Sequence, residues 1–385
     1  PEKIPLKVKV VLLGTREIYY AMQSYDQEFS ELFRVLADFD HVLNDSDKTL
    51  QSFSALVRER GKRLDYPSIS NDAIAILAMN AMRRSEHKHK LSNNIQQINE
   101  LLDEACFIWR KHQVSDCIEA SHVEAAIKSK HKRTSRISEI MLDEIKEQQV
   151  LINTDGFSVA KVNGLTVLSV GDDSFGTPAR ITATAYAGKQ GVTDIEREVD
   201  LGRAIHSKGV MLLTGYLGHK YGQSFHISLS ANIAIEQSYG LIDGDSASLA
   251  EICALISAIT ELPLDQSIAV TGSINQHGEV QSVGGVNDKI EGFYKLCKTR
   301  GLTGKQGVII PKTNQINLLL DKEVIEAVKD NQFAIYGVEN IDQALEILMQ
   351  KDAGVKTQTG DFTNNTIHMI ATERLKKLSS LSNKR

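Results

Sequence analysis

The sequence predicts a mixed α/β fold in which a helical region precedes a larger domain built of strands and helices. Over residues 41–149, apolar residues recur at helical spacing. From about residue 150, turn residues are followed by short, alternating, β-branched segments, and amphipathic helices lie between these segments. Because strands and helices are interleaved there, we expect an α/β or α+β domain over residues 150–350.

Composition limits the classes of function. The 385 residues are 42% hydrophobic, enough for one large core or two to three smaller ones. A formal net charge of −5 provides no excess of positive charge for nucleic acid, so we expect no nucleic-acid partner. The cysteines lack the CxxC spacing of a structural zinc site, which favours a reducing compartment. Without an apolar run of about 18 residues or a signal-peptide pattern, we expect a cytoplasmic protein with no membrane contact.

Residues 1–40 contain two strand-like segments. Residues 8–13 form a continuous apolar run that ends at Gly14, a pattern typical of a strand buried on both faces. Residues 33–39 form the second such segment. Two strands are too few for a stable open sheet, so we expect the chain to begin inside a larger domain.

Residues 41–149 carry helix signals. Ser70 or Asn71 can cap a helix that continues through Met82. Ser121 and Glu124 have the spacing of a capping box at the start of a later helix.

A basic run at residues 128–136 could indicate a nucleic-acid patch. Acidic residues lie beside it on the same predicted helices, among them Glu124 and Glu139. We therefore favour a solvated, charge-mixed helix face.

The domain over residues 150–350 contains seven predicted strands. They span residues 158–162, 166–170, 180–187, 226–234, 267–271, 307–310 and 333–336. In the fourth segment apolar and polar residues alternate, as in a strand with one buried face. Residues 351–385 form a polar tail that we expect to be mobile or weakly docked.

Ser246 is a candidate nucleophile. The turn-rich run at 243–248, Asp-Gly-Asp-Ser-Ala-Ser, leads into a helix and places Ser246 at a helix N-terminus. Backbone N–H groups are unpaired there and the helix dipole is positive, so an oxyanion could be stabilised. Taken alone, a helix cap is the simpler interpretation of Ser246.

Lys289 is a candidate base. It follows a glycine pair at 284–285, begins an amphipathic helix and shares a face with Phe293 and Leu296. Partial desolvation would lower the pKa of its amine, although a lysine lying along an apolar surface with its charge in water is simpler in isolation. Residues 301–305 lack the spacing of a phosphate-binding P-loop.

In combination, four motifs closely resemble the proteolytic domain of Lon-family proteases, nearest to the LonB-like bacterial branch. They lie at residues 236–240, 243–248, 271–273 and 284–289, and the similarity covers residues 150–350, including 206–209 and 309–311. The resemblance implies that Ser246 is the nucleophile, Lys289 its general base, and Thr271 the residue that orients the lysine amine. It also implies that the backbone N–H of Ser246, with that of Asp245 or Gly244, supplies the oxyanion donors.

The resemblance extends to the first part of the chain. Residues 1–40 look like the end of an AAA+ ATPase core, and residues 41–149 like its helical lid subdomain. Where the family usually places a nucleotide-sensing arginine, this sequence has Asn93 and Asn94. Walker A and Walker B sequences are absent, so we expect no cofactor or metal in this chain and ATP with Mg in the full-length protein.

The function implied is a serine endopeptidase that degrades unfolded or tagged proteins, depends on ATP and assembles as a homo-hexamer. The alternative is a non-proteolytic AAA+-linked remodelling or oligomerisation module. Such a module has no physical reason to keep Ser246, Lys289 and Thr271 together.

Overall fold

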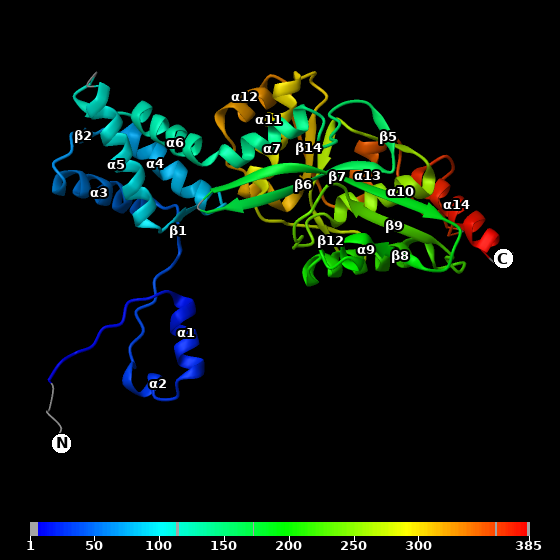
Figure 1. Ribbon diagram of the computed structural model, residues 1–385, viewed down its shortest axis with the longest axis horizontal. Coiled ribbons are helices and arrows are strands. Elements are labelled where there is room, and N and C mark those ends of the chain that lie inside the picture. The colour runs from blue at the N-terminus through cyan, green and yellow to red at the C-terminus, as the bar shows by residue number, and fades with distance from the viewer. Residues whose placement is uncertain (1–6, 113–114, 172, 359, 383–385) are drawn as a thin grey trace.

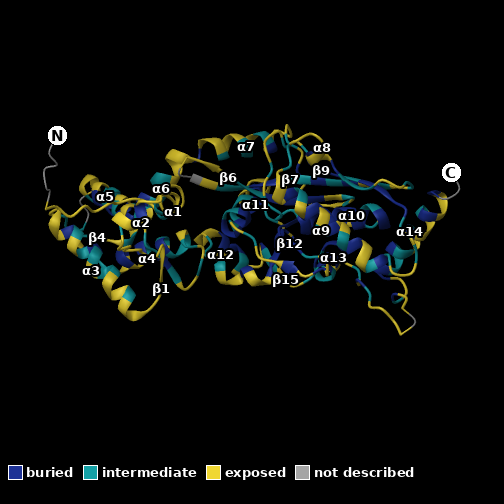
Figure 2. Cartoon of the chain, turned by 90° about the horizontal axis from the view of Figure 1, so that it is seen from below, coloured by how far each residue is buried: buried dark blue, intermediate teal, exposed yellow. Residues whose placement is uncertain are grey.

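The predicted mixed α/β fold is confirmed by the structure, a computed structural model that describes residues 7–112, 115–171, 173–358 and 360–382. The molecule is elongated, with the helical region at one end and the α/β domain at the other (Figure 1). Figure 2 shows buried residues, in dark blue, concentrated in the α/β domain where helices face the sheet.

The described part of residues 7–40 contains two helices, α1 (Arg16–Tyr25) and α2 (Phe29–Leu32), and no strand. The prediction of strands at residues 8–13 and 33–39 is therefore wrong. A strand needs a neighbour to satisfy its backbone, and the described residues offer none to these two segments, so side chains such as Leu13 are exposed.

The helical region has its own core, formed where α3 to α6 pack together around Ile69 and Ile118. Its elements are α3 (Asp47–Arg63), α4 (Asn71–Arg84), α5 (Ile95–His112), α6 (Ala120–Thr134), α7 (Arg136–Lys146), β1 (Val42–Asn44), β2 (Ser68–Ile69), β3 (Lys90–Ser92) and β4 (Cys117–Ile118). Two short strand pairs, β1 with β3 and β2 with β4, join the helices. These pairs were not predicted, because strands of two or three residues are too short to show a periodic pattern.

Helix caps explain where two of these helices begin. Ser70 caps α4 as predicted, since its Oγ accepts the Ala73 N–H at 3.1 Å. The capping box predicted at Ser121 is wrong, because the cap of α6 is Glu119, two residues earlier. Nδ1 of His122 accepts the Glu119 N–H at 3.0 Å, which is the reciprocal bond that a glutamate usually supplies.

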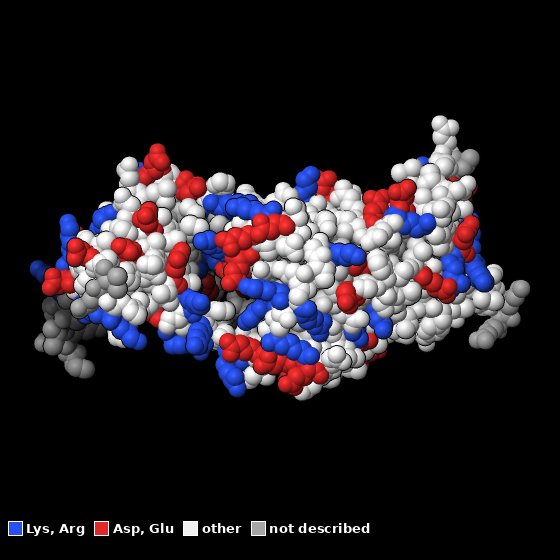
Figure 3. All heavy atoms as spheres, turned by 90° about the horizontal axis from the view of Figure 1, so that it is seen from above, with Lys and Arg blue, Asp and Glu red and all other residues white. Residues whose placement is uncertain are grey.

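The basic run lies on α6 and at the start of α7, and its cations face acidic groups of α5. Lys130 Nζ lies 3.4 Å from Glu100, and Arg133 lies 2.6 Å from Glu104. Blue and red atoms are likewise interspersed on the face of the molecule drawn in Figure 3. These ion pairs agree with the predicted charge-mixed surface.

The α/β domain is organised around a seven-stranded sheet of order β15-β14-β11-β6-β7-β9-β8. The strands of the domain are β5 (Phe157–Val159), β6 (Lys161–Val170), β7 (Asp173–Tyr186), β8 (Gly191–Asp194), β9 (Ser230–Ile235), β10 (Pro263–Asp265), β11 (Ile268–Val270), β12 (Ser273–Ile274), β13 (Val280–Gln281), β14 (Gly307–Pro311) and β15 (Ala334–Val338). The four strands from β15 to β6 are parallel, and β7 pairs antiparallel to both β6 and β9. All seven predicted segments overlap strands, although the first is divided by Ala160 at φ 57°.

Helices cover both faces of this sheet. They are α8 (Ile195–Glu198), α9 (Ala204–Tyr221), α10 (Ser248–Thr260), α11 (Val286–Arg300), the 3₁₀ helix η1 (Lys312–Asn317), α12 (Lys322–Lys329), α13 (Ile341–Met349) and α14 (Ile367–Ser382). Successive strand residues point to opposite faces, so Val270 packs with the core of α9, α10, α13 and α14, whereas Ala269 packs with the core of α11 and α12. In the described part of the chain, no helix is both long and apolar enough to span a membrane.

The polar tail is not weakly docked, which corrects the expectation of a mobile segment. Helix α14 lies at the far end of the α/β domain (Figure 1), and its Ile367, Ala371 and Leu375 are part of the main core. Nδ1 of His368 lies 2.7 Å from the Tyr221 hydroxyl in a buried contact. The segment is polar in overall composition, and its buried apolar residues lie on one side of α14. Composition alone therefore did not predict that the helix docks on the core.

We predict that Leu375→Ala destabilises the α/β domain by about 2–5 kcal/mol, because the side chain is 1% exposed and its removal leaves a cavity. Chemical denaturation measures the change, and Lys377→Ala on the exposed side of α14 is the control, with an effect within about 0.5 kcal/mol. Equal stability of both variants would contradict the docking of α14.

Candidate active site

Ser246 lies in the turn directly before α10, and this turn is tied to the chain that follows β11. The Gly272 N–H donates to the Ser246 carbonyl at 2.9 Å, and the Leu249 N–H donates to the Gly272 carbonyl at 3.1 Å. Ser246 does not cap the helix, since the cap position is Ala247. The simpler interpretation of Ser246 as a helix cap therefore fails.

Asp245 holds the shape of this turn. Its carbonyl accepts the Ser248 hydroxyl at 2.8 Å, and its Oδ2 accepts the Ser273 hydroxyl at 2.8 Å. The Ser248 Oγ in turn accepts the Ile274 N–H at 3.1 Å. Side chains before, within and after the turn are thus joined in one hydrogen-bonded network, which fixes the position of Ser246.

Lys289 lies in the first turn of α11, on the other face of the sheet. The cap residue of this helix is Gly285, whose φ of +65° is a left-handed conformation that favours glycine. The structure brings Lys289 toward Ser246 because α11 packs unusually close to β7. A Cβ at Gly292 would lie 2.0 Å from the Gly176 carbonyl oxygen, and a Cβ at Gly176 would lie 2.6 Å from the Lys289 Cα.

The two candidate groups meet at the end of β11. Lys289 Nζ donates to Ser246 Oγ at 3.0 Å and to Thr271 Oγ1 at 3.1 Å. The Thr271 hydroxyl then donates to the Ser246 carbonyl at 3.3 Å. Thr271 therefore connects the lysine amine to the backbone of the serine turn.

The environment of Lys289 favours a neutral amine. The residue is 3% exposed, and Phe293 and Leu296 on the same helix are fully buried. This burial lowers the pKa of Lys289 from 10.5 to about 8, because desolvation disfavours the charged form. The carboxylates of Glu86 and Asp245 act in the opposite direction and limit the decrease in pKa.

Two backbone groups at the turn are available as donors. In the part of the chain that the structure describes, the N–H groups of Asp245 and Ser246 have no hydrogen-bond acceptor. The Gly244 N–H differs, since it donates to Oδ1 of Asp243 at 2.8 Å. The structure thus brings Asp245 and Ser246 together as donors and leaves Gly244 engaged elsewhere.

Asn93 and Asn94 serve the start of α5. Nδ2 of Asn93 donates to the Asp40 carbonyl at 2.9 Å, and Oδ1 of Asn94 accepts the Gln97 N–H at 3.3 Å. The bond of Asn94 is a local bond typical of a helix N-terminus, whereas the bond of Asn93 ties the start of α5 to the segment before β1.

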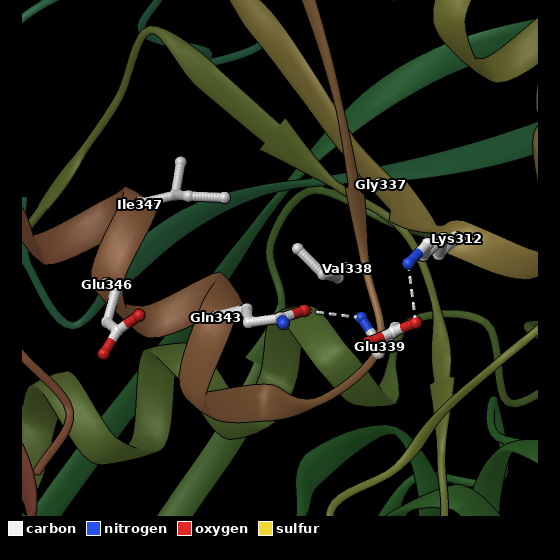
Figure 4. A pocket seen from close by; sticks show the side chains of 7 residues that line it. All are labelled: Lys312, Gly337, Val338, Glu339, Gln343, Glu346 and Ile347. Carbon is white, nitrogen blue, oxygen red and sulfur yellow. Dashed lines mark hydrogen bonds and ion pairs between the residues drawn. The ribbon is translucent and has the colours of Figure 1, made fainter.

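A depression in the surface lies away from these residues. It has a volume of about 420 Å³ and is formed between η1, β15 and α13. Lys312 pairs with Glu339 at 2.8 Å across its edge (Figure 4). None of the five candidate residues lines it, so it adds nothing to the candidate active site.

The sequence did not identify Glu86 or Ser273 as parts of this site. Glu86 follows α4 in the helical region, and its Oε2 accepts the Gly285 N–H at 3.4 Å. No spacing rule connects positions about two hundred residues apart, so the contact is visible only in the fold. Ser273 belongs to the 271–273 motif, and its hydroxyl group is the feature of the sequence that could have indicated a role in this site.

Family models of Lon proteases match three stretches of the chain. "LonB-like, AAA domain" matches residues 1–40, and "Archaeal LonB, AAA+ ATPase LID domain" matches residues 68–133. "Lon protease (S16) C-terminal proteolytic domain" matches residues 219–351. The last match includes Ser246, Thr271 and Lys289.

Similar proteins carry the same family name. A Lon protease homolog of Escherichia coli is 36% identical over 90% of this chain and 59% of its own length. A Lon protease homolog of Haemophilus influenzae is 36% identical over 94% of this chain and 59% of its own length. An archaeal Lon protease of Archaeoglobus fulgidus is 28% identical over 74% of this chain and 43% of its own length. The chain therefore spans less than two thirds of the length of these relatives.

We predict that Lys289→Met stabilises the domain by about 1–3 kcal/mol at pH 7, because it removes a buried amine whose protonation is disfavoured in the folded state. Between pH 8 and 10.5 the unfolded chain binds this proton more tightly than the folded chain. Wild-type stability should therefore rise relative to the variant across that window.

Denaturant titrations from pH 7 to 10 measure the difference between wild type and variant. Lys295→Met, at an exposed position of the same helix, is the control, and its difference in stability from wild type should not decrease as the pH rises. A difference that is constant with pH would contradict the depressed pKa of Lys289.

Proposed function

Because the chain belongs to the Lon protease family, we propose that it carries the peptidase site of an ATP-dependent serine endopeptidase, with Ser246 as nucleophile and Lys289 as general base. The observation that carries the proposal is the contact of 3.0 Å between Lys289 Nζ and Ser246 Oγ within a buried setting. A serine–lysine pair is a known variant of the serine–histidine–aspartate arrangement.

In this mechanism the neutral Lys289 amine accepts the Ser246 proton as Oγ bonds to the carbonyl carbon of the peptide. The resulting ammonium gives that proton to the leaving amine, and the C–N bond breaks. Water then attacks the acyl-serine ester with the same amine as base, which releases the carboxylic acid and restores Ser246.

The depressed pKa makes this base usable near neutral pH. A lysine at about 10.4 is neutral in roughly one molecule in a thousand at pH 7.5, a cost of about 4 kcal/mol. With a pKa of about 8, roughly a quarter of the molecules hold the free amine.

The remaining candidate residues position these two groups and stabilise charge. Thr271 accepts from the lysine amine and donates to the serine carbonyl, so it fixes the direction of the amine. The Ser246 and Asp245 N–H groups, next to the N-terminus of α10, are the proposed oxyanion donors. Gly244 contributes its positive φ of +88° to the turn, and its N–H is not among the donors proposed.

For the whole protein we propose ATP with Mg as cofactors, unfolded or tagged proteins as substrates, and a homo-hexamer as the assembly. The relatives named as Lon proteases and the match to an AAA+ lid support this extension. The non-proteolytic alternative would leave the costly burial of Lys289 beside Ser246 without a use.

We predict that Lys289→Arg and Ser246→Ala each abolish peptide cleavage, because guanidinium stays protonated and alanine cannot attack. The double variant should lose little more, since the two residues act as one unit. Thr271→Val should reduce the rate on the order of 10²-fold. The assay is cleavage of an unfolded protein and a fluorogenic peptide by the full-length protein with ATP.

Lys295→Arg, at an exposed position of α11, is the matched control and should retain normal turnover. Retention of normal turnover by Lys289→Arg would rule out the serine–lysine mechanism. An inactive wild type that still hydrolyses ATP would instead favour the non-proteolytic alternative.

We also predict that kcat/KM rises with pH and levels off above an apparent pKa of about 8, as Lys289 loses its proton. Glu86→Gln should move the midpoint to lower pH, because this carboxylate stabilises the ammonium form. Rate profiles from pH 6 to 10 measure both effects. A midpoint near 10, or one that Glu86→Gln moves upward, contradicts the assignment.

A further inference from the structure

A second group of titratable side chains lies buried in the α/β domain, separate from Ser246 and Lys289. Asp194 ends β8, Glu196 lies in α8, and His206 lies in the first turn of α9. One potential ligand atom from each lies within 4.8 Å of the others. The three residues are 5%, 5% and 1% exposed, respectively, so the group is closed off from solvent.

Several polar atoms of this group are unsatisfied. In the described part of the chain, both carboxylate oxygens of Asp194, Oε2 of Glu196 and Nε2 of His206 are buried without a hydrogen-bond partner. The other oxygen of Glu196 accepts the Ile235 N–H at 2.8 Å, which anchors this carboxylate to β9. Each buried polar atom without a partner costs about 1–3 kcal/mol, so such a concentration calls for a ligand.

The two nitrogens of His206 face different carboxylates. Nε2 lies 3.4 Å from Oδ1 of Asp194, and Nδ1 lies 3.9 Å from Oε1 of Glu251 in α10. Glu251 is 1% exposed, and this oxygen also lacks a hydrogen-bond partner. A histidine that binds a metal through one nitrogen commonly presents its other N–H to a carboxylate, which fixes the ring.

We propose that Asp194, Glu196 and His206 bind a divalent transition-metal ion of the zinc class, and that Glu251 orients the imidazole of His206. An imidazole nitrogen with two carboxylates suits Zn²⁺ and similar ions better than Mg²⁺ or Ca²⁺, which prefer oxygen ligands alone. A divalent ion offsets the charges of both ligand carboxylates, Asp194 and Glu196, whereas a protonated His206 offsets one.

This site adjoins the serine turn through the backbone. The chain between α8 and α9 is bridged to Ile242, whose N–H donates to the Leu201 carbonyl at 2.9 Å and whose carbonyl accepts the Arg203 N–H at 2.9 Å. Ile242 lies shortly before Ser246 in the sequence, and Glu251 lies in α10, the helix that follows Ser246. The ion therefore acts as a structural link between α8, α9 and the elements that carry the nucleophile.

The test uses the full chain after treatment with a chelator and dialysis. Calorimetric titration with Zn²⁺ should give about one tightly bound ion per chain and a rise in the unfolding temperature. His206→Gln and Asp194→Asn should each weaken binding more than about tenfold and remove the thermal shift. Glu251→Gln should weaken binding about 10- to 100-fold without abolishing it.

An exposed pair of histidines provides the control for adventitious binding. The rings of His219 and His277 lie 5.1 Å apart at the surface, and replacing both with alanine should leave the tight site intact. Loss of tight binding in that double variant, or its retention in His206→Gln, would overturn the proposal. So would a wild-type chain that binds Mg²⁺ but neither Zn²⁺ nor Co²⁺.

A spectroscopic measurement decides the matter if the cluster variants fail to fold. X-ray absorption at the zinc edge of the wild-type complex should show a nitrogen and oxygen shell with a single imidazole. A shell with two imidazoles would assign the ion to the surface pair and reject the buried site.

Discussion

The close approach of helix α11 to strand β7 is the constraint on which the site depends. Gly176 and Gly292 face each other with no room for a Cβ on either, so the helix lies against the strand backbone. Ser174 on the same strand donates to Asp288 at 2.6 Å and holds the start of the helix. Because Lys289 follows directly, its amine reaches Ser246 only if this packing is kept.

Burial of Lys289 lowers stability and makes the proposed chemistry available. The same desolvation that disfavours the ammonium group supplies a neutral amine near pH 8. Among the described residues, this amine meets the hydroxyl groups of Ser246 and Thr271 at hydrogen-bond distance. A core built only for stability would place an apolar side chain at this position. The cost is met by the surrounding cores, which bury Phe293 and Leu249 completely.

Much of the fold and the two residues of the proposed dyad could be predicted from the sequence, and the failures have physical causes. Ser246 and Lys289 lie beside glycines and turn residues that mark helix starts, so local patterns place them at helix N-termini, but their pairing was predicted only from the resemblance to Lon proteases. Residues 8–13 have the pattern of a buried strand, but pairing depends on neighbours that the described residues do not provide. The group of Asp194, Glu196 and His206 has no regular spacing, because a strand end and two helices bring it together.

The helical region also reaches the site through charge. Arg83 of α4 forms an ion pair of 2.5 Å with Glu291 on α11, and Glu86 in the next turn raises the pKa of Lys289 against the effect of burial. Coulombic stabilisation weakens as charges separate. A displacement of this turn away from α11 therefore lowers the pKa of Lys289 and increases the neutral fraction, provided that the amine stays buried. The contact between the helical region and α11 therefore influences both the position of the proposed base and its pKa.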